Sequence, residues 1–325
     1  MRSVAYVLSG VLLSASLPAI SAERATTNYP NKPVRILVGQ APGGAVDIIS
    51  RGLAQKLTDA FGHPVVIDNR SGAAGSIAAA LVANAAPDGY TVLFVSSSYS
   101  INPSLYKKLP YDPNRDLQPV TLIASSPFVV LAHPSVGVKG IKDLIALAKS
   151  KPKHLNYGSG GTGSSGHLAG VLFGNLAQVE LTHVPYKGAG PALSDVIGGQ
   201  LHLIFSSIVS GLPHATSGKL TALAVTSGKR SSAAPNLPTV AESGVPRYEF
   251  SSWYGLLVPR LTPKAIVGRL NSAVVGALNQ PDFKERLSKE GTEAVGSSPE
   301  QFAVFLREEI AKWGSLVKAS GIQAE

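Results

Sequence analysis

Short buried-type strands alternate with amphipathic helices along most of this 325-residue chain, and glycine-rich turns join them. Residues 34–38 form a strand-like run, and the helix-like run that follows has one apolar face and ends at Gly62. The same order returns after residue 150, with a strand at 154–157 and a helix at 164–177. Strands that alternate with helices predict βαβ units and a largely parallel sheet.

Two of the turns are richest in glycine and lie in separate halves of the chain. The first spans 41–47 and reads APGGAVD, and the second spans 158–167 and reads GSGGTGSSGH. Each follows a strand and opens a helix, so several backbone N–H groups are exposed at the positive end of a helix dipole. Two such turns, one from each lobe, predict a ligand with anionic groups at both ends.

The length and composition are typical of an ordered globular protein. The chain is long enough for a large core and two domains, with 44% hydrophobic and 15% charged residues. Its net charge is +9, but Lys and Arg occur singly or in pairs without interleaved aromatic residues. Because a nucleic-acid-binding surface requires clustered basic residues, we expect no nucleic-acid partner and a diffuse positive field that attracts small anions.

The N-terminus has the features of a secretory signal. Arg2 precedes an apolar stretch over 4–17, and small residues follow at 18–22, where we place the cleavage site. The apolar stretch is too short to span a bilayer comfortably. The chain has no cysteine, which excludes a lipid-anchored cysteine, disulfides and thiolate metal sites. We predict a signal peptide over 1–22 and a soluble periplasmic protein, with a frayed N-terminal helix as the alternative.

Two stretches pass between the two blocks of alternating strands and helices. The first, 117–133, reads as two extended segments broken at 125–127. The second, 235–254, is rich in Pro, Ser and Gly. These crossings predict two lobes with a cleft between them: domain 1 over 29–127 and 251–325, and domain 2 over 128–250.

The C-terminal part of the chain is helical. Thr262 and Pro263 are placed to cap one helix, and a capping box at 298–301 opens the last one. No strand–helix alternation remains for a third domain. We therefore expect these helices to pack back on the first lobe.

Part of the second turn matches a dinucleotide-binding motif. Gly158, Gly160 and Gly163 satisfy G-x-G-x-x-G after a strand and before a helix. Glu180 lies at about the distance expected for the acid that binds the ribose, but it precedes the next strand, whereas that acid belongs at the strand's carboxyl end. An NAD(P)-dependent enzyme is therefore kept as the alternative function.

A serine hydrolase is a third reading of the same turn. The nucleophile elbow needs G-x-S-x-G, and His167 occupies the place of the final glycine. Ser159, Thr162 and Ser164 fit better as helix caps and ligand hydroxyls, and His167 as a structural hydrogen-bonding group. The seven histidines show no H-x-x-x-H or H-E-x-x-H spacing, so we expect no metal site.

Further candidate ligand contacts lie near the ends of strands. Asp47 favours the dipole of its helix, and it either orients the first turn or accepts from a ligand. Ser97 follows a strand at the edge where ligands bind in open α/β sheets. Tyr186 and Lys187 lie in a third strand-to-helix turn, where Tyr186 is placed to pack along a ligand's carbon chain and Lys187 is otherwise simply solvated.

Together these residues resemble a known family, the periplasmic solute receptors of tripartite tricarboxylate transporters, often called Bug receptors. The resemblance runs from residue 29 through the last helix, which is nearly all of the chain after the signal. Several spaced stretches carry it and are more specific than any single glycine motif: 42–44 with Asp47 and Arg51, 69–75, 87–90, 158–167, 184–188 and 198–200.

The resemblance implies an α/β Venus-flytrap fold, the two-lobed fold of periplasmic binding proteins, in which each lobe is a mixed, mostly parallel sheet flanked by helices. It implies a monomeric receptor, without a cofactor or catalysis, that captures a small mono- or dicarboxylate and delivers it to inner-membrane transporter subunits. In the family, main-chain amides and ordered waters hold the carboxylates. The site residues carried over are Gly43, Gly44, Asp47, Ser97, Ser159, Thr162, Gly163, Ser164, Tyr186 and Lys187.

Overall fold

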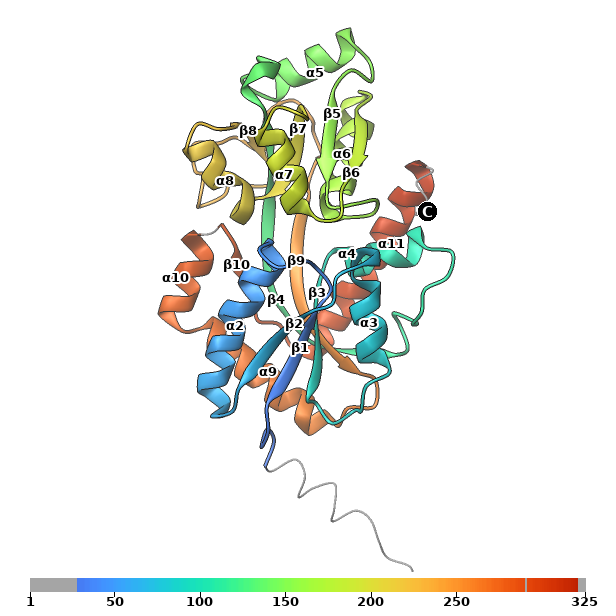
Figure 1. Ribbon diagram of the computed structural model, residues 1–325, viewed down its shortest axis with the longest axis vertical. Coiled ribbons are helices and arrows are strands. Elements are labelled where there is room, and N and C mark those ends of the chain that lie inside the picture. Colours follow the sequence, from blue (N-terminus) through green and yellow to red (C-terminus); the bar gives the residue numbers. More distant parts are fainter. Residues whose placement is uncertain (1–27, 290, 321–325) are drawn as a thin grey trace, which may run out of the picture.

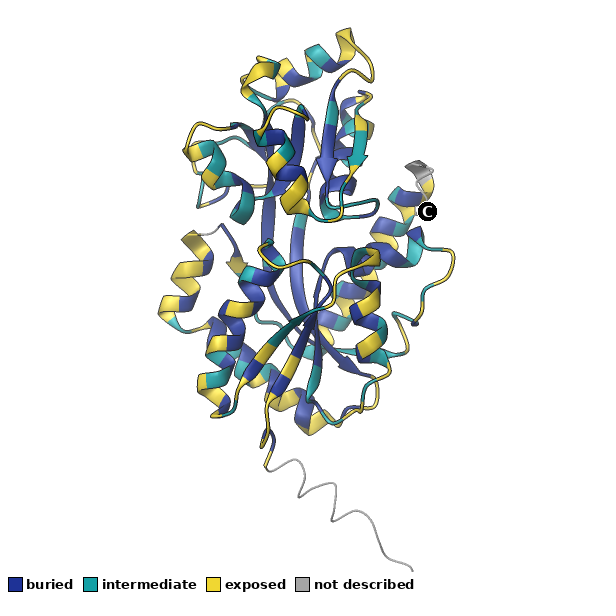
Figure 2. Ribbon diagram, in the orientation of Figure 1, coloured by how far each residue is buried: buried dark blue, intermediate teal, exposed yellow. Residues whose placement is uncertain are grey.

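Two α/β lobes joined by two long strands make up the molecule (Figure 1). The computed structural model describes residues 28–289 and 291–320, and the expected signal peptide lies outside them. The joining strands are β4 (Leu117–Ala132) and β9 (Ser251–Pro259), and both are buried along most of their length (Figure 2). The predicted fold class, a two-lobed mixed α/β fold, is confirmed.

The first lobe is built on three parallel strands, on β9 and on the first part of β4. Strand β1 (Val34–Val38) pairs in parallel with β2 (Val65–Asn69) and with β3 (Thr91–Ser96). Strand β9 is antiparallel to both β3 and β4, and the short β10 (Glu293–Ala294) pairs with β4. The helices are α2 (Ala45–Phe61), η1 (Ala73–Gly75), α3 (Ser76–Ala83), α4 (Ser98–Leu105), α9 (Lys264–Leu278), α10 (Pro281–Lys289) and α11 (Pro299–Ser320).

The second lobe repeats the pattern on the other end of β4. Strand β5 (Asn156–Ser159) is parallel to β6 (Thr182–Pro185) and to β7 (Leu203–Ser207). Strand β4 is antiparallel to β7 and to β8 (Thr221–Val225). The helices are η2 (Pro134–Val136), α5 (Ile141–Ser150), α6 (Ser165–Ala177), α7 (Ala189–Ile197) and α8 (Ile208–Thr216).

The first crossing differs from its prediction. The sequence predicted two extended segments broken at 125–127, whereas β4 is one strand through that point. Its pairing partner changes there: residues up to Pro127 pair with β9, and residues from Phe128 pair with β7 and β8. Proline fixes φ near a value that extended backbone tolerates, so Pro127 does not end the strand. The domain bounds placed at 127/128 and 250/251 stay a prediction.

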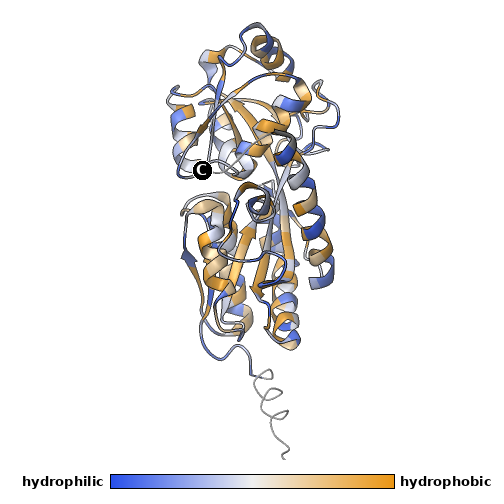
Figure 3. Ribbon diagram, turned by 90° about the vertical axis from the view of Figure 1, so that its right-hand side faces the viewer, coloured by the Kyte–Doolittle hydropathy of each residue, from blue (hydrophilic) through white to orange (hydrophobic). Residues whose placement is uncertain are grey.

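Both lobes bury apolar residues on the two faces of their sheets, and Figure 3 shows hydrophobic residues gathered on the strands and on the inward faces of the helices. In the first lobe, α2 and α9 pack on one face, and α3 and α11 pack on the other. In the second lobe, α5 and α6 contribute to one core and α7 to another. None of the helices in the described part of the chain is long and apolar enough to cross a membrane.

The C-terminal helices cover more than the first lobe. Ser298 and Gln301 form the predicted capping box, with reciprocal bonds of 2.9 and 3.2 Å. The predicted cap by Thr262 is wrong, because Pro263 is the N-cap of α9 and no side chain caps it. Helix α9 packs on the first lobe as expected, but the end of α11 places Trp313 and Val317 in the core of the second.

Candidate functional site

The first glycine-rich turn is held in place by the side chain of Asp47. The turn leaves β1 at the edge of the sheet nearest the second lobe and leads into α2 (Figure 1). Gly43 has a φ of 85°, a conformation that favours glycine, and its N–H donates to Asp47 Oδ2 over 3.1 Å. Asp47 lies in the first turn of α2 and is 4% exposed. It therefore orients the turn, one of the two roles considered for it from the sequence.

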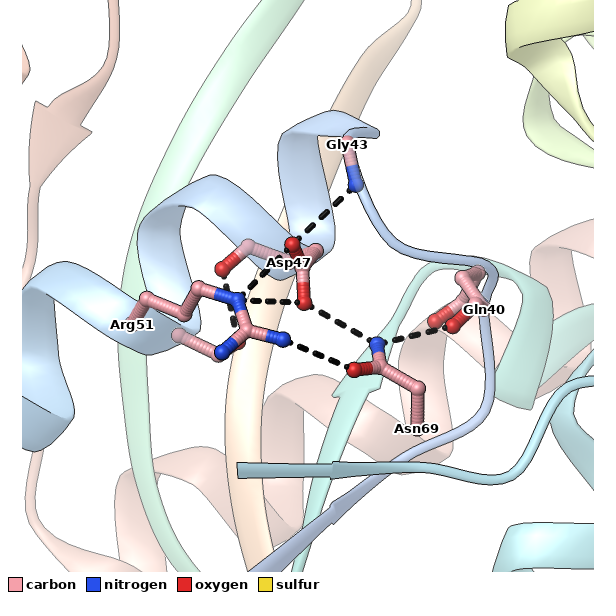
Figure 4. Close-up of polar contacts among 6 residues, drawn as sticks. Gln40, Gly43, Asp47, Arg51 and Asn69 are labelled. Atoms are coloured by element: carbon pink, nitrogen blue, oxygen red, sulfur yellow. Dashed lines mark hydrogen bonds and ion pairs between the residues drawn. The ribbon is translucent and has the colours of Figure 1, made fainter. Parts of the chain in front are cut away.

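Asp47 also anchors a wider polar network at this edge (Figure 4). Arg51 Nε donates to both carboxylate oxygens, and Asn69 Nδ2 donates to Asp47 Oδ1, each over 3.0 Å. Asn69 also accepts from Arg51 Nη2 and donates to the Gln40 carbonyl, again over 3.0 Å. Burial alone would raise the pKa of the Asp47 carboxyl, but the hydrogen bonds from Arg51, Gly43 and Asn69 outweigh it and lower that pKa. The carboxylate is therefore charged at neutral pH.

The start of α2 keeps backbone donors free. Gly44 is the N-cap, and no side chain caps the helix. Within the described residues, the N–H groups of Gly44, Ala45 and Val46 donate to no acceptor, and the N–H of Ile48 donates to the Gly44 carbonyl. Free N–H groups at a helix N-terminus favour an anion. Gly44 can thus offer its amide to a ligand, whereas the amide of Gly43 is already used by Asp47.

The second glycine-rich turn repeats this arrangement with a histidine. Gly163 has a φ of 78°, and its N–H donates to His167 Nδ1 over 3.0 Å. The glycine and its acceptor are four residues apart, as are Gly43 and Asp47 in the first turn. Ser164 is the N-cap of α6, and its Oγ accepts from the N–H of His167 over 3.4 Å. The capping role considered for Ser164 is confirmed.

The other two candidate hydroxyls of the second turn are placed differently. Ser159 is 1% exposed, and its Oγ lies 2.6 Å from His183 Nε2. The same Oγ donates to the carbonyl and accepts from the N–H of Gly161, at 3.0 and 3.2 Å. Thr162 is partly exposed, and its side chain forms no hydrogen bond within the part of the chain that the structure describes. Ser159 therefore supports the turn from inside, and Thr162 presents its hydroxyl at the surface.

Ser97 lies in a contact between the two lobes. It is fully buried at the N-cap of α4, with its Oγ 2.8 Å from Ser165 Oγ of α6 and 3.0 Å from Ser252 Oγ of β9. Nearby, Gly163 packs so closely on Leu105 of α4 that a Cβ would lie 1.9 Å from the leucine Cδ1. The second turn thus touches the first lobe beside α4. The role of Ser97 as a ligand contact stays a prediction.

Tyr186 and Lys187 lie in the turn after β6. Tyr186 Oη donates to Asp195 Oδ2 on α7 over 2.5 Å, and this hydrogen bond raises the pKa of the phenol. The backbone N–H of Tyr186 donates to the Ser159 carbonyl over 3.0 Å. Lys187 is exposed and forms no ion pair among the described residues. Because the phenol is tied to α7, packing of Tyr186 along a ligand stays a prediction.

A small hollow of about 10 Å³ lies at the first-lobe edge, and sequence reasoning missed most of its lining. Gln40 Nε2 lies 3.4 Å from the hydroxyls of Ser96 and Ser98. Gln40 Oε1 and Asn102 Oδ1 are buried acceptors that have no hydrogen-bond partner in the described chain. The serines could be found because they end β3, but Gln40 and Asn102 reach the hollow from other elements and follow no motif.

The geometry favours neither enzymatic alternative. Glu180 precedes the first residue of β6 and forms an ion pair with Lys153 over 3.5 Å. It therefore lies at the start of β6, which is the end of that strand farther from the second turn. The Ser159–His183 contact resembles a nucleophile and its base, but the serine is buried and bonded within its own turn. Among the described residues, no group of three His, Cys, Asp or Glu is placed to hold a metal ion.

A family model matches residues 49–322, and its description is "Tripartite tricarboxylate transporter family receptor". A UPF0065 protein of Pseudomonas sp. is 36% identical over 312 residues, which cover 96% of this chain and 93% of that protein. The protein BugT of Bordetella pertussis is 34% identical over 304 residues, with 93% of each chain covered.

Solved structures show the same similarity over 89–91% of this chain. A protein of R. palustris solved with adipate gives a TM-score of 0.88 at 38% identity, covering 91% of this chain and 99% of that chain. The periplasmic binding protein BugD gives 0.86 at 34% identity, covering 91% and 100%. MatC from Rhodopseudomonas palustris with bound malate gives 0.83 at 33% identity, covering 89% and 100%.

The fold and the sequence therefore point to the same family of proteins. The two-lobed arrangement is that of periplasmic binding proteins, and the family resemblance expected from the spaced glycine motifs is confirmed. This chain belongs to the receptor family of the tripartite tricarboxylate transporters.

Proposed function

We propose that this receptor binds a small mono- or dicarboxylate between its lobes and delivers it to a membrane transporter. The main supporting observation is that both α2 and α6 begin with backbone N–H groups that have no acceptor among the described residues, at the edge of their lobe that is turned toward the other lobe (Figure 1). In α6 these are the N–H groups of Ser165 and Gly166, since that of His167 donates to the capping Ser164. Each helix N-terminus favours an anion. A ligand with a carboxylate at each end satisfies both.

The two turns supply donors and no nucleophile. In the first turn, we assign ligand contact to the amide of Gly44 and the adjoining first turn of α2. In the second, we assign it to Thr162 and to the first amides of α6, next to Ser164. Gly43, Asp47, Ser159 and Gly163 shape these surfaces, because their own donors and acceptors are already paired within the protein.

Two further observations support a dicarboxylate. The chain has a net charge of +9, which raises the local concentration of anions. Two relatives were solved with adipate and with malate, both dicarboxylates. If such a ligand binds the closed arrangement of the lobes more tightly than the open one, its binding would shift the population toward the closed arrangement. The size of the shift is set by the difference between these two affinities.

A thermal-stability screen tests the proposal. Purified, ligand-free receptor is heated with malate, adipate, other C3 to C8 mono- and dicarboxylates, aromatic carboxylates, NAD and NADP. At least one carboxylate is expected to raise Tm, since a ligand at 100 times its Kd stabilises by about 2.7 kcal/mol, and the dinucleotides are not. A rise with NAD and none with any carboxylate would contradict the proposal.

We further propose that the receptor is exported, acts as a monomer in the periplasm and passes its ligand to inner-membrane subunits. The family and the signal-like N-terminus support this assignment. Fractionation of cells that express the full chain is expected to recover shortened protein from the periplasm. Recovery of full-length protein in the cytoplasm alone would count against it.

A further inference from the structure

Two histidines from different elements of the second lobe stack on one another beside the second turn. His167 lies in the first turn of α6 and His183 on β6, with ring centroids 3.8 Å apart and planes 18° apart. The parallel register of β5 and β6 sets His183 opposite Tyr157. The ring of Tyr157 lies 5.1 Å from His183 and 6.5 Å from His167. Tyr157 is thus the third titratable group in this contact among the described residues.

Each histidine holds one part of the turn. The N–H of Gly163 donates to His167 Nδ1 over 3.0 Å, so this nitrogen is the acceptor and must be unprotonated. His183 Nε2 lies 2.6 Å from Ser159 Oγ, which is bonded in turn to the N–H and the carbonyl of Gly161. The two rings therefore fix the turn near its beginning, at Ser159, and near its middle, at Gly163.

We propose that the stacked His167–His183 pair positions the second turn for its ligand, and that it does so only while both rings are neutral. The proposal rests on the proposed function in one respect, that this turn binds a carboxylate. A protonated His167 Nδ1 cannot accept from Gly163, and two imidazolium rings 3.8 Å apart repel one another. These are positioning residues, since their rings act on the ligand through the turn.

The surroundings keep the pair neutral. Burial lowers the pKa of His167 to about 3, with a further contribution from His183. Burial lowers the pKa of His183 to about 4. No carboxylate in the described chain contributes to either value, so no counter-ion stabilises a charged ring.

The direction of the pH effect follows from the lowered pKa values. A histidine released from the turn regains a pKa near its ordinary value of 6.5 and binds a proton more readily than one in place. The arrangement is therefore fully stable above pH 6.5 and loses stability as pH falls from 6.5 toward 4. Acid is expected to loosen the turn and release its ligand.

Hydrogen exchange of the turn tests the inference without any ligand. The variant His167→Asn/His183→Gln is the matched control, because an Asn amide oxygen can replace Nδ1, a Gln amide can replace Nε2, and neither titrates. Exchange of peptides over 158–167 is compared at pH 7.0 and 4.5, corrected for intrinsic rates and normalised to peptides from β7. The wild-type turn is expected to open at least 10-fold more at pH 4.5, and the variant less than 3-fold more.

A second pair of variants separates positioning from titration. His167→Phe and His183→Phe remove the ring nitrogens that contact Gly163 and Ser159, and should expose the turn to exchange at both pH values. If the Phe variants fail to fold, the proposal is still tested by comparing how the wild type and the Asn/Gln variant respond to acid. An equal response of the wild type and the Asn/Gln variant to acid would overturn the proposal.

Affinity provides the functional readout. Kd for malate and adipate is measured at both pH values, and protonation of the ligand affects wild type and the Asn/Gln variant equally. The ratio of Kd at pH 4.5 to Kd at pH 7.0 is expected to be at least 5-fold larger for the wild type, and equal ratios would contradict ligand positioning by the pair. If the exchange pattern appears but neither protein binds any carboxylate of the screen, the proposed function fails and the role of the pair in shaping the turn stands.

Discussion

The turn before α2 and the turn before α6 hold a glycine N–H with the same four-residue spacing but with acceptors of different charge. Asp47 is a carboxylate supported by Arg51 and Asn69, whereas the acceptor in the second turn is a neutral imidazole stacked on another. The same backbone shape is thus fixed by an ion pair in one lobe and by uncharged rings in the other. We therefore expect the two turns to respond differently to acid.

The largest effect is expected from adding a methyl group to each glycine. Gly163→Ala should cost about 2–5 kcal/mol, from the left-handed φ and from overlap with Leu105. Gly43→Ala, with no atom within 4 Å of its added Cβ, should cost only the backbone term of about 1–2 kcal/mol. Urea unfolding measures both, and equal losses would show that contact with Leu105 does not constrain the second turn.

Removal of the charged acceptor comes next. Asp47→Ala leaves the N–H of Gly43 and the amide of Asn69 without their acceptor and should cost about 1–3 kcal/mol. Asp47→Asn retains an acceptor oxygen and should cost less. Unfolding free energies at pH 7 test this order, and an Asn variant as unstable as the Ala variant would argue that charge, not hydrogen bonding, holds the first turn.

The contribution of Asp47 should depend on pH only in strong acid. Its folded pKa lies below the ordinary value of 3.8, so the stability it provides is present above pH 3.8 and is lost as pH falls through the folded pKa. The free-energy difference between wild type and Asp47→Asn should therefore be constant from pH 5 to 8 and shrink as pH falls below 3.8. A change in that difference between pH 5 and 6.5 would be inconsistent with this reading.

The serine contact between the lobes should have a moderate effect. Ser97→Ala removes bonds to Ser165 and Ser252 and should cost about 1 kcal/mol. A double-mutant cycle with Ser165→Ala is expected to give a coupling of about 0.5–1 kcal/mol. Additive losses in that cycle would mean that the two hydroxyls do not support one another across the lobes.

The smallest effect is expected at an exposed ion pair. Lys229 Nζ lies 3.5 Å from Glu293 Oε1 on β10, and the two side chains are 79% and 58% exposed. Exposed pairs contribute little, so Lys229→Ala should change Tm by less than about 1 °C. A larger shift in differential scanning calorimetry would point to a wider role of this surface.

Much of the fold could be predicted because many strands and helices have a recognisable pattern in their own local sequence. The strand predicted over 34–38 has these bounds in the structure, the helix predicted over 164–177 is α6 (Ser165–Ala177), and Gly62 ends α2 in the left-handed conformation expected of it. Helix α8 was missed because Pro213 lies inside it, and β9 because it is buried on both faces and shows no alternation. Continuous burial removes the period on which a strand prediction depends.

The site likewise has a part that could be predicted and a part that could not. Within each glycine turn the residues that act together, Asp47 in the first and the capping Ser164 in the second, lie a few residues from their partners, so each group could be predicted. The contact of Ser159 with His183 depends on the register of β5 and β6, and that of Ser97 with Ser165 on how the lobes meet. Neither of these two contacts could be predicted from a local sequence pattern.

The joining strands have one further consequence. Because β4 and β9 are hydrogen-bonded to each other from Leu117 to Pro127, and β4 alone continues into the sheet of the second lobe, they act as a two-stranded leaf spring. Such a ribbon bends easily across its flat face and resists shear along the strands, whose ladder of hydrogen bonds would have to break. We therefore expect the lobes to move relative to one another mainly in this one direction, so that the turns before α2 and α6 would separate and return along the same path.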